Sequence, residues 1–334
     1  MAVSCQVRRE PAPVGASRLA VVGVAAVSER EALSPVAWAP DGRRFAYGAR
    51  DGVWVHDPRG PVERLVATGG PVGAVAWSLP ADRIAYVDRG TLYTVRPDGG
   101  GGRRIPTPGL VLRPVWAPGG DRLAFVVRET GPRRTRLWLA SPDGATLRPI
   151  LWETHGREIA ALSWYPDAVH LFVALAAPDG ETITEWWRVR IAYPDFRRLP
   201  APPPGAVEAA MAPNAEWIAV IAGERGGERL LVQRADGSGA RVIAGPAARL
   251  TGLAWSPHSD KVAYAVEAGG PAAEIYAASV VGAARVRVAA HPHDASHPSP
   301  GRSLVWSPDG LRLAFGTNTG ATLGRVWIAR FQAR

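Results

Sequence analysis

Three histidines and a carboxylate gather in one short stretch of the chain, which reads H-P-H-D-A-S-H-P. The stretch contains His291, His293, Asp294 and His297, and so holds three of the seven histidines. Imidazole nitrogens and carboxylate oxygens are ligands for divalent ions such as Zn, Mn, Ni or Cu, provided that the loop folds so that they converge. The stretch therefore predicts a candidate metal site. A solvated loop stiffened by its prolines is the alternative interpretation.

A second group of polar residues lies just ahead of, or at the start of, apolar segments that recur along the chain. These residues are Arg113, His155, Arg157, Glu158, Glu208, Arg249 and Arg302. A guanidinium group binds a carboxylate through two parallel hydrogen bonds, so such a set is suited to a carboxylate ligand or a peptide end. The group predicts a ligand-binding polar mouth, with ordinary surface charge as the alternative.

Most strong enzyme signatures are absent from the sequence. It has no G-x-S-x-G elbow, no H-E-x-x-H pair, no cysteine pair for zinc and no Walker loop. Cys5 is the single cysteine, so an internal disulfide is excluded. These absences favour a chain that is not an enzyme.

The charge of the chain raises the question of an anionic partner. The formal net charge is +9, but Lys261 is the only lysine and the arginine pairs are scattered. Phosphate tracking needs a continuous basic stripe, usually with stacking aromatic residues, so the pattern argues against nucleic acid. The apolar run from Leu19 to Val27 has nine residues. A membrane-spanning helix needs about 20, so we interpret this run as a strand and expect no membrane span.

The elements that position these residues are visible in a repeated phrase. It occurs seven times, as VAWAPDGRRFAY, VAWSLPADRIAY, PVWAPGGDRLAF, LSWYPDAVHLFV, AAMAPNAEWIAV, LAWSPHSDKVAY and LVWSPDGLRLAF. Trp38 and Trp306 are 268 residues and six intervals apart, or about 45 residues per repeat, which is typical of propeller blades. We interpret each Trp as an apolar plug between blades; Met211 takes its place in the fifth copy.

Each repeat also reads internally as four short strands bounded by Gly, Pro or Asp. Pro and Gly in the A-P-D-G turn suit the conformations that close the first strand onto the second. The fourth strands are rich in arginine, which discourages edge-to-edge association of an exposed outer strand. We therefore predict an all-β, seven-bladed β-propeller of four-stranded antiparallel blades.

The seventh repeat lacks a fourth strand before the chain ends. The strand-like segment 18–27 precedes the first repeat and has no other partner. We expect it to pair with Val326-Trp327-Ile328 and close the ring. The predicted organisation is a flexible tail over 1–17 and a single propeller domain over 18–334. Blades are expected to begin near residues 34, 72, 111, 158, 206, 249 and 301.

The phrases VAWAPDGRRFAY, LAWSPHSDKVAY and LVWSPDGLRLAF resemble the repeat of the TolB-like β-propeller superfamily. The resemblance covers about residues 35–331 and includes no counterpart of the additional N-terminal domain of TolB. It implies a rigid disc that binds proteins, peptides or small ligands, often in the bacterial cell envelope or periplasm. Some related seven-bladed propellers are metal-dependent lyases.

We expect the functional face to be the one where strand four crosses to the next blade and strand two crosses to strand three. The Pro-Asp-Gly turns lie on the opposite face and are expected to be structural. The leading hypothesis is a non-enzymatic binding or scaffold module that engages a protein, a peptide or a small anionic ligand. The alternative is a metal-dependent lyase that uses the loop from His291 to His297 and a divalent metal cofactor.

Overall fold

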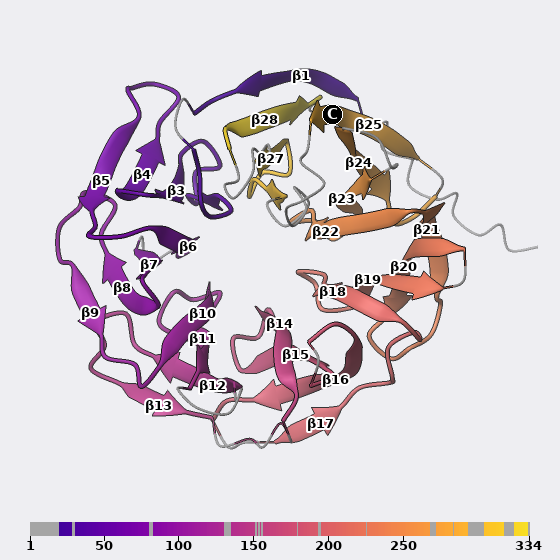
Figure 1. The fold of residues 1–334 in the computed structure, drawn as a ribbon, viewed down its shortest axis with the longest axis horizontal. Helices are drawn as coiled ribbons and strands as arrows, with labels where there is room; N and C mark the ends of the chain where they lie inside the picture. Colours follow the sequence, from indigo (N-terminus) through magenta and orange to yellow (C-terminus); the bar gives the residue numbers. More distant parts are fainter. Residues whose placement is uncertain are drawn as a thin grey trace, which may run out of the picture.

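The computed structural model describes residues 20–28, 31–79, 83–129, 135–150, 152, 154, 156–178, 180–192, 195–224, 226–267, 272–282, 284–292, 304–316 and 324–332. In this part of the chain the strands form seven sheets, each of four antiparallel strands, arranged as blades around a central opening (Figure 1). The predicted seven-bladed propeller is confirmed. None of the described residues forms a helix that could span a bilayer.

The four strands of each blade follow one another outward from the channel to the rim of the ring. From the first blade to the seventh, the innermost strands are β2 (Ala37–Trp38), β6 (Val72–Trp77), β10 (Leu110–Trp116), β14 (Glu158–Trp164), β18 (Ala206–Met211), β22 (Arg249–Trp255) and β26 (Val305–Trp306). The second strands are β3 (Phe45–Ala49), β7 (Ile84–Asp88), β11 (Leu123–Arg128), β15 (His170–Ala176), β19 (Trp217–Glu224), β23 (Lys261–Glu267) and β27 (Arg312–Gly316). The third strands are β4 (Gly52–His56), β8 (Thr91–Val95), β12 (Thr135–Ala140), β16 (Ile183–Arg190), β20 (Gly227–Arg234), β24 (Ala272–Ser279) and β28 (Val326–Phe331). The outermost strands are β5 (Glu63–Ala67), β9 (Arg103–Ile105), β13 (Leu147–Pro149), β17 (Phe196–Arg198), β21 (Arg241–Ala247), β25 (Arg285–Pro292) and β1 (Val21–Ala26).

The ring closes through β1, which is the fourth strand of the last blade. β1 pairs antiparallel with β28, with Ala25 opposite Ile328 and Ala26 opposite Trp327, as the sequence predicts. The buried hydroxyl of Ser28 then accepts a hydrogen bond from the backbone N–H of Val326 at 2.8 Å. Residues 298 positions apart are thus tied together, so neither end of the array of blades is left open.

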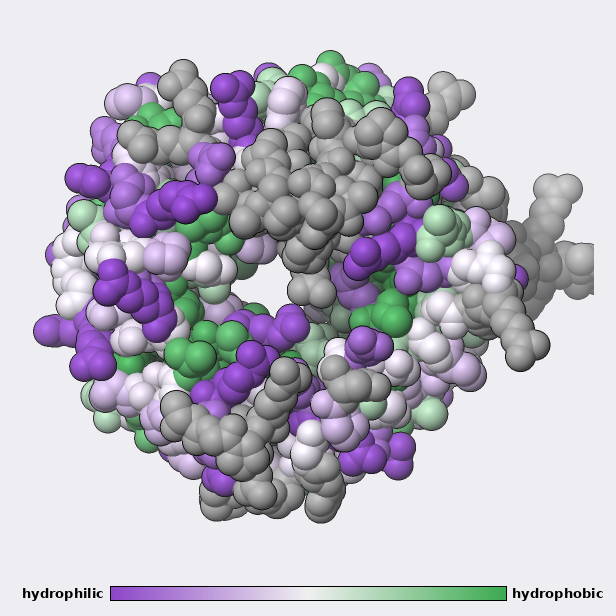
Figure 2. Space-filling model, viewed as in Figure 1, coloured by the Kyte–Doolittle hydropathy of each residue, from purple (hydrophilic) through white to green (hydrophobic). Residues whose placement is uncertain are grey.

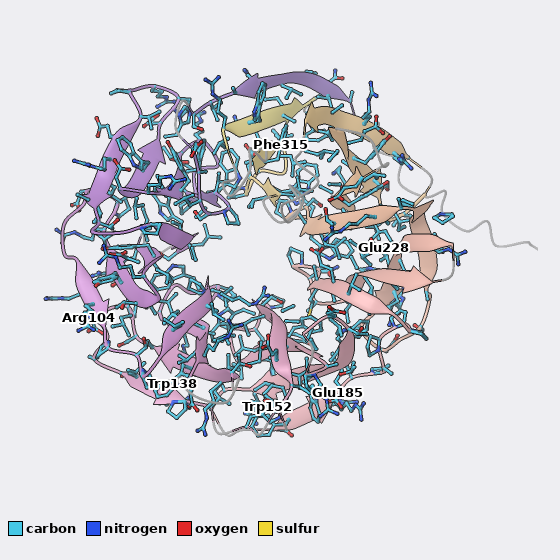
Figure 3. All side chains as sticks on the ribbon, viewed as in Figure 1. Arg104, Trp138, Trp152, Glu185, Glu228 and Phe315 are labelled. Atoms are coloured by element: carbon cyan, nitrogen blue, oxygen red, sulfur yellow. The ribbon has the colours of Figure 1, made fainter. Side chains whose placement is uncertain are left out.

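The hydrophobic core lies between neighbouring blades. One cluster joins Leu230 of the fifth blade to Val262 of the sixth, and another joins Ile275 of the sixth to Phe315 of the seventh. Phe315 is labelled in Figure 3. All four side chains are at most 1% exposed. Because each blade buries both faces against its neighbours, the blades form one rigid ring.

The turn that follows the innermost strand contains a left-handed residue in each of the six blades where the structure describes it. Gly42 and Gly310 supply it with φ near +65°, as expected for the Pro-Asp-Gly turn (φ 64° and 67°). In three repeats without that glycine the same position is taken by Ala168, Ala215 and Ser259, with φ of 53°, 60° and 58°. A side chain with a Cβ in this conformation costs about 1 kcal/mol, so these turns are held by the rest of the blade.

Candidate functional site

A ring of tryptophans connects the innermost strands of successive blades. The indole Nε1 of Trp306 donates to the carbonyl of Ala254 in the preceding blade at 3.1 Å. The same bond joins Trp38 to Val305, Trp116 to Ala76, Trp164 to Val115 and Trp255 to Ala210, at 2.9–3.1 Å. The plug interpretation is thus confirmed in part: the indoles pack between blades, and they also bond the blades together around the channel.

The fifth blade interrupts this ring, because Met211 has no N–H to donate to the fourth blade. Nearby, the hydroxyl of Ser163 is shielded from solvent and has no hydrogen-bond partner among the described residues. Ser163 lines the channel just ahead of Trp164. The junction between the fourth and fifth blades therefore presents a polar group in otherwise apolar surroundings.

The channel contains a cavity of about 680 Å³. Six blades contribute to its lining, which consists of Val36, Ala37, Trp38, Val75, Ala76, Trp77, Leu79, Pro114, Val115, Trp116, Ala117, Pro118, Ser163, Trp164, Pro166, Ala210, Met211, Ala212, Pro213 and Trp255. None of these residues is charged. Figure 2 shows the channel from one mouth, where both hydrophobic and hydrophilic residues border the opening. The cavity has the size and lining of a ligand site.

The position of the cavity differs from the expected site. Ala117, Pro118 and Pro213 follow the end of an innermost strand and lead into its turn. The cavity therefore lies in the half of the channel beside the Pro-Asp-Gly turns, whereas the sequence directs attention to the opposite face. The sequence does contain a signal for this cavity, namely the repeated Ala-Trp-Ala-Pro or Ala-Trp-Ser-Pro phrase. Its meaning was missed because the inward-facing residues of adjacent copies meet only in the closed ring.

The predicted mouth residues that the structure describes are engaged with the protein itself. Arg157 and Arg198 each lie 3.3 Å from one oxygen of Glu185, whose other oxygen accepts a hydrogen bond from Trp187 at 2.8 Å. Glu185 is buried, so both guanidinium groups are held by a carboxylate that has little access to solvent. Because Arg157 already pairs with a carboxylate of the protein, it is less available to bind an anionic ligand.

Two more of these residues also contact other strands. Glu158 lies 3.6 Å from Arg128 of the preceding blade, and Arg249 lies 3.9 Å from Glu267 in its own blade. Arg113 is exposed in a bulge of β10, with φ of 52°. The structure distributes these side chains over several blades. Their use as a common ligand site stays a prediction.

Glu208 spans two blades. Its two carboxylate oxygens accept the backbone N–H groups of Gly252 and Leu253 at 2.9 Å each. Gly252 has φ of 70° and lies where the register of β22 is interrupted. The backbone N–H groups of Gly252 and Leu253 therefore point toward the fifth blade. Successive N–H groups of this kind form an anion-binding concavity, and the protein's own carboxylate fills it.

The remaining predicted site residues are only partly described. His291 lies near the end of β25, opposite Ala273, but its side chain lies outside the described part of the structure. His155, Arg302 and the metal candidates His293, Asp294 and His297 lie outside the described residues altogether. Among the residues that are described, no group of three or more His, Cys, Asp or Glu could hold a metal ion. The predicted metal site stays a prediction.

The carboxylates of the turns are fixed as structural groups. A backbone N–H of Gly100 lowers the pKa of Asp98, and the hydroxyl of Ser141 lowers the pKa of Asp143. Burial raises the pKa of Asp260, but hydrogen bonds from Lys261 and Ser256 outweigh it and the net pKa falls. Each of these carboxylates accepts a hydrogen bond within its own turn, from Gly100, Ser141 and Ser256 respectively.

Several known propellers are similar to this chain. The family model of the lipoprotein LpqB β-propeller domain matches residues 200–330. TolB from Acinetobacter baumannii is 15% identical with a TM-score of 0.54, over 89% of this chain and 66% of that one. A putative TolB from Agrobacterium tumefaciens is 15% identical with a TM-score of 0.56, over 82% and 95% of the two chains. An oligogalacturonate lyase in complex with manganese is 14% identical with a TM-score of 0.72, over 92% and 93%.

No curated protein matches the chain in sequence. The seven-bladed ring, the LpqB propeller match and the TolB neighbours together fit a TolB-like propeller. A propeller of this kind supports a role in binding or scaffolding, and the low identities extend no specific ligand to this chain.

Proposed function

We propose that this chain, a propeller of the TolB-like fold, is a non-enzymatic binding module that takes an apolar segment of a protein or peptide into its central channel. The cavity of about 680 Å³ carries the proposal, because its lining is uncharged and comes from six blades of a rigid ring. A rigid, preformed site loses little conformational entropy when it binds, which favours affinity.

The lining favours an apolar segment over a small anionic ligand. Moving an anion into a site without a charged partner is costly, and the described arginines of the predicted mouth do not line the cavity. Tryptophan faces and proline rings instead suit aliphatic and aromatic side chains.

Titration with 1-N-phenylnaphthylamine, an uncharged dye that fluoresces in apolar surroundings, tests the site. Leu79 lines the cavity and is 44% exposed, so Leu79→Asp places a carboxylate at its rim without opening the core. Val242 on the outermost strand β21 is 53% exposed and provides the matched control Val242→Asp.

We expect saturable binding of one dye to the wild type and to Val242→Asp, and affinity at least about tenfold lower for Leu79→Asp. Equal affinity in all three proteins would place the apolar site elsewhere.

The alternative function, a metal-dependent lyase, depends on the predicted ligands His291, His293, Asp294 and His297. No described contact supports it over the binding module, and its direct test is the metal content of the protein.

A further inference from the structure

The innermost strand of each blade has one neighbouring strand in the described structure, so its other edge faces the channel (Figure 1). In the first blade the backbone N–H of Ala39 donates outward, to the chain that enters β3, and Ala37 is paired with β3 in the same direction. Because backbone groups alternate in direction along a strand, the N–H and C=O of Trp38 point into the channel. The carbonyl of Val36 also points inward, since it lies opposite the N–H of Ala37 in one peptide plane.

The same geometry recurs around the ring. In each blade the residue that follows the tryptophan position donates its N–H outward to the chain that enters the second strand; these residues are Ala39, Ser78, Ala117, Tyr165, Ala212, Ser256 and Ser307. The sixth blade shows that an inward group can be given a partner. Leu253 lies two residues before Trp255, and its N–H is accepted by the carboxylate of Glu208 from the fifth blade. The channel wall therefore presents backbone groups that can pair with a further partner.

The side chains of the cavity lining leave this pairing to the backbone. The indoles of Trp38, Trp116, Trp164 and Trp255 each donate to a carbonyl of the preceding blade, and the hydroxyl of Ser163 is shielded. A peptide that enters the cavity carries backbone N–H and C=O groups, and shielding these groups from water without new partners is costly. The inner edges of the strands are the part of the wall that can supply such partners.

Among the strands that line the cavity, β2 offers two inward-facing residues. Val36 and Trp38 both line the cavity. In the described part of the chain, no hydrogen bond reaches the carbonyl of Val36 or the backbone N–H and C=O of Trp38. β2 therefore has an open edge that spans two inward positions.

The other lining strands offer less. On β10 the corresponding residues are Pro114 and Trp116, and Pro114 has no N–H to donate. On β6 they are Val75 and Trp77, but Trp77 makes a further interaction. The strands of the fourth, fifth and sixth blades each contribute one inward residue to the lining, namely Trp164, Met211 and Trp255.

We propose that the bound segment lies extended in the channel and pairs through its backbone with the inner edge of β2, at Val36 and Trp38. This inference rests on the proposed function and adds how the segment is held. An extended polypeptide presents N–H and C=O groups with the same repeat as the strand beside it, which a hydrocarbon chain or a helix does not. Backbone pairing does not depend on side-chain identity, so the channel selects extended apolar segments rather than one sequence.

Displacement of 1-N-phenylnaphthylamine by the capped peptide acetyl-Ser-Leu-Val-Leu-Ser-amide tests the mode of binding. The valine and each leucine are N-methylated in turn, which removes one backbone N–H at a time. In a paired strand every second N–H faces the neighbouring strand. We expect either the valine variant or both leucine variants to lose at least about tenfold in affinity, and the remaining variants to change by less than about twofold.

Equal losses at all three positions, or no loss at any of them, would overturn the backbone pairing. So would a peptide that fails to displace the bound dye. In each of these cases saturable dye binding that is weakened by Leu79→Asp would still support the apolar site. Absence of dye binding by the wild type would instead refute the proposed function itself.

Hydrogen exchange at the tryptophan backbone identifies the strand. In protein labelled at the α-nitrogen of tryptophan, the NMR signal of Trp38 is the one that Trp38→Phe removes. Saturation with the unmethylated peptide should slow exchange at the backbone N–H of Trp38 at least about tenfold. Exchange at Trp164, the matched inward N–H on β14, should stay unchanged. Slowing at Trp164 that equals or exceeds the slowing at Trp38 would overturn the assignment to β2.

Discussion

Replacing Trp306 with Phe should remove one link of the tryptophan ring. The indole is 6% exposed and donates to the carbonyl of Ala254, and it packs 4.9 Å from the ring of Phe331. Phe cannot donate, so the carbonyl loses a buried partner at a cost of about 1 to 2 kcal/mol. The smaller ring also leaves a cavity, which adds about 1 to 2 kcal/mol. We therefore expect Trp306→Phe to lower the free energy of unfolding by about 2 to 4 kcal/mol.

Urea denaturation followed by circular dichroism measures this change, provided that the slope of the transition is the same in both proteins. Met211→Leu is the matched control, because Met211 occupies the equivalent place with no N–H to lose. A swap of similar volume should cost less than about 1.5 kcal/mol. If Trp306→Phe costs no more than Met211→Leu, the indole hydrogen bonds do not hold the blades together and our reasoning fails.

Three further predictions concern a turn, the closure of the ring and the metal. Ala168→Gly should raise the free energy of unfolding by about 0.5 to 1 kcal/mol, because glycine adopts the observed φ of 53° without strain; a lower urea midpoint would contradict this. Ser28→Ala should cost about 1 to 3 kcal/mol and speed hydrogen exchange at the backbone N–H of Val326, which loses its acceptor; unchanged exchange would show that the tie is not needed. Elemental analysis of protein purified without a His tag should find about one divalent ion per chain if the lyase hypothesis holds, and about none after His293→Ala; absence of metal from the wild type would refute that hypothesis.

Much of the fold could be predicted because its determinants recur in the sequence. The repeated Trp and turn residues predict seven blades, and the missing strand of the last repeat predicts the pairing of β1 with Ile328. The turns containing Ala168 and Ser259 depart from the glycine pattern, yet they adopt the same left-handed conformation. There the surrounding sheet overrides the local preference.

The site was less predictable, because its properties depend on contacts between blades. Glu208 has the residue type and position of a ligand-binding carboxylate, but it binds the backbone of Gly252, whose bulge the sequence does not reveal. The pairing of Arg157 with Glu185 joins the residue just before β14 to β16, two positions that the sequence does not bring together. Trp38 and its equivalents were interpreted as packing residues, and only the closed ring shows that they also line a cavity.

Selection of peptides from a random displayed library on the wild-type chain tests the central claim most directly. We predict that the selected peptides are rich in aliphatic and aromatic residues, and that Leu79→Asp lowers their affinity at least about tenfold. Glu158→Ala, which alters the opposite mouth of the channel, should leave their affinity unchanged. Acidic peptides whose binding is lost in Glu158→Ala and retained in Leu79→Asp would contradict the account.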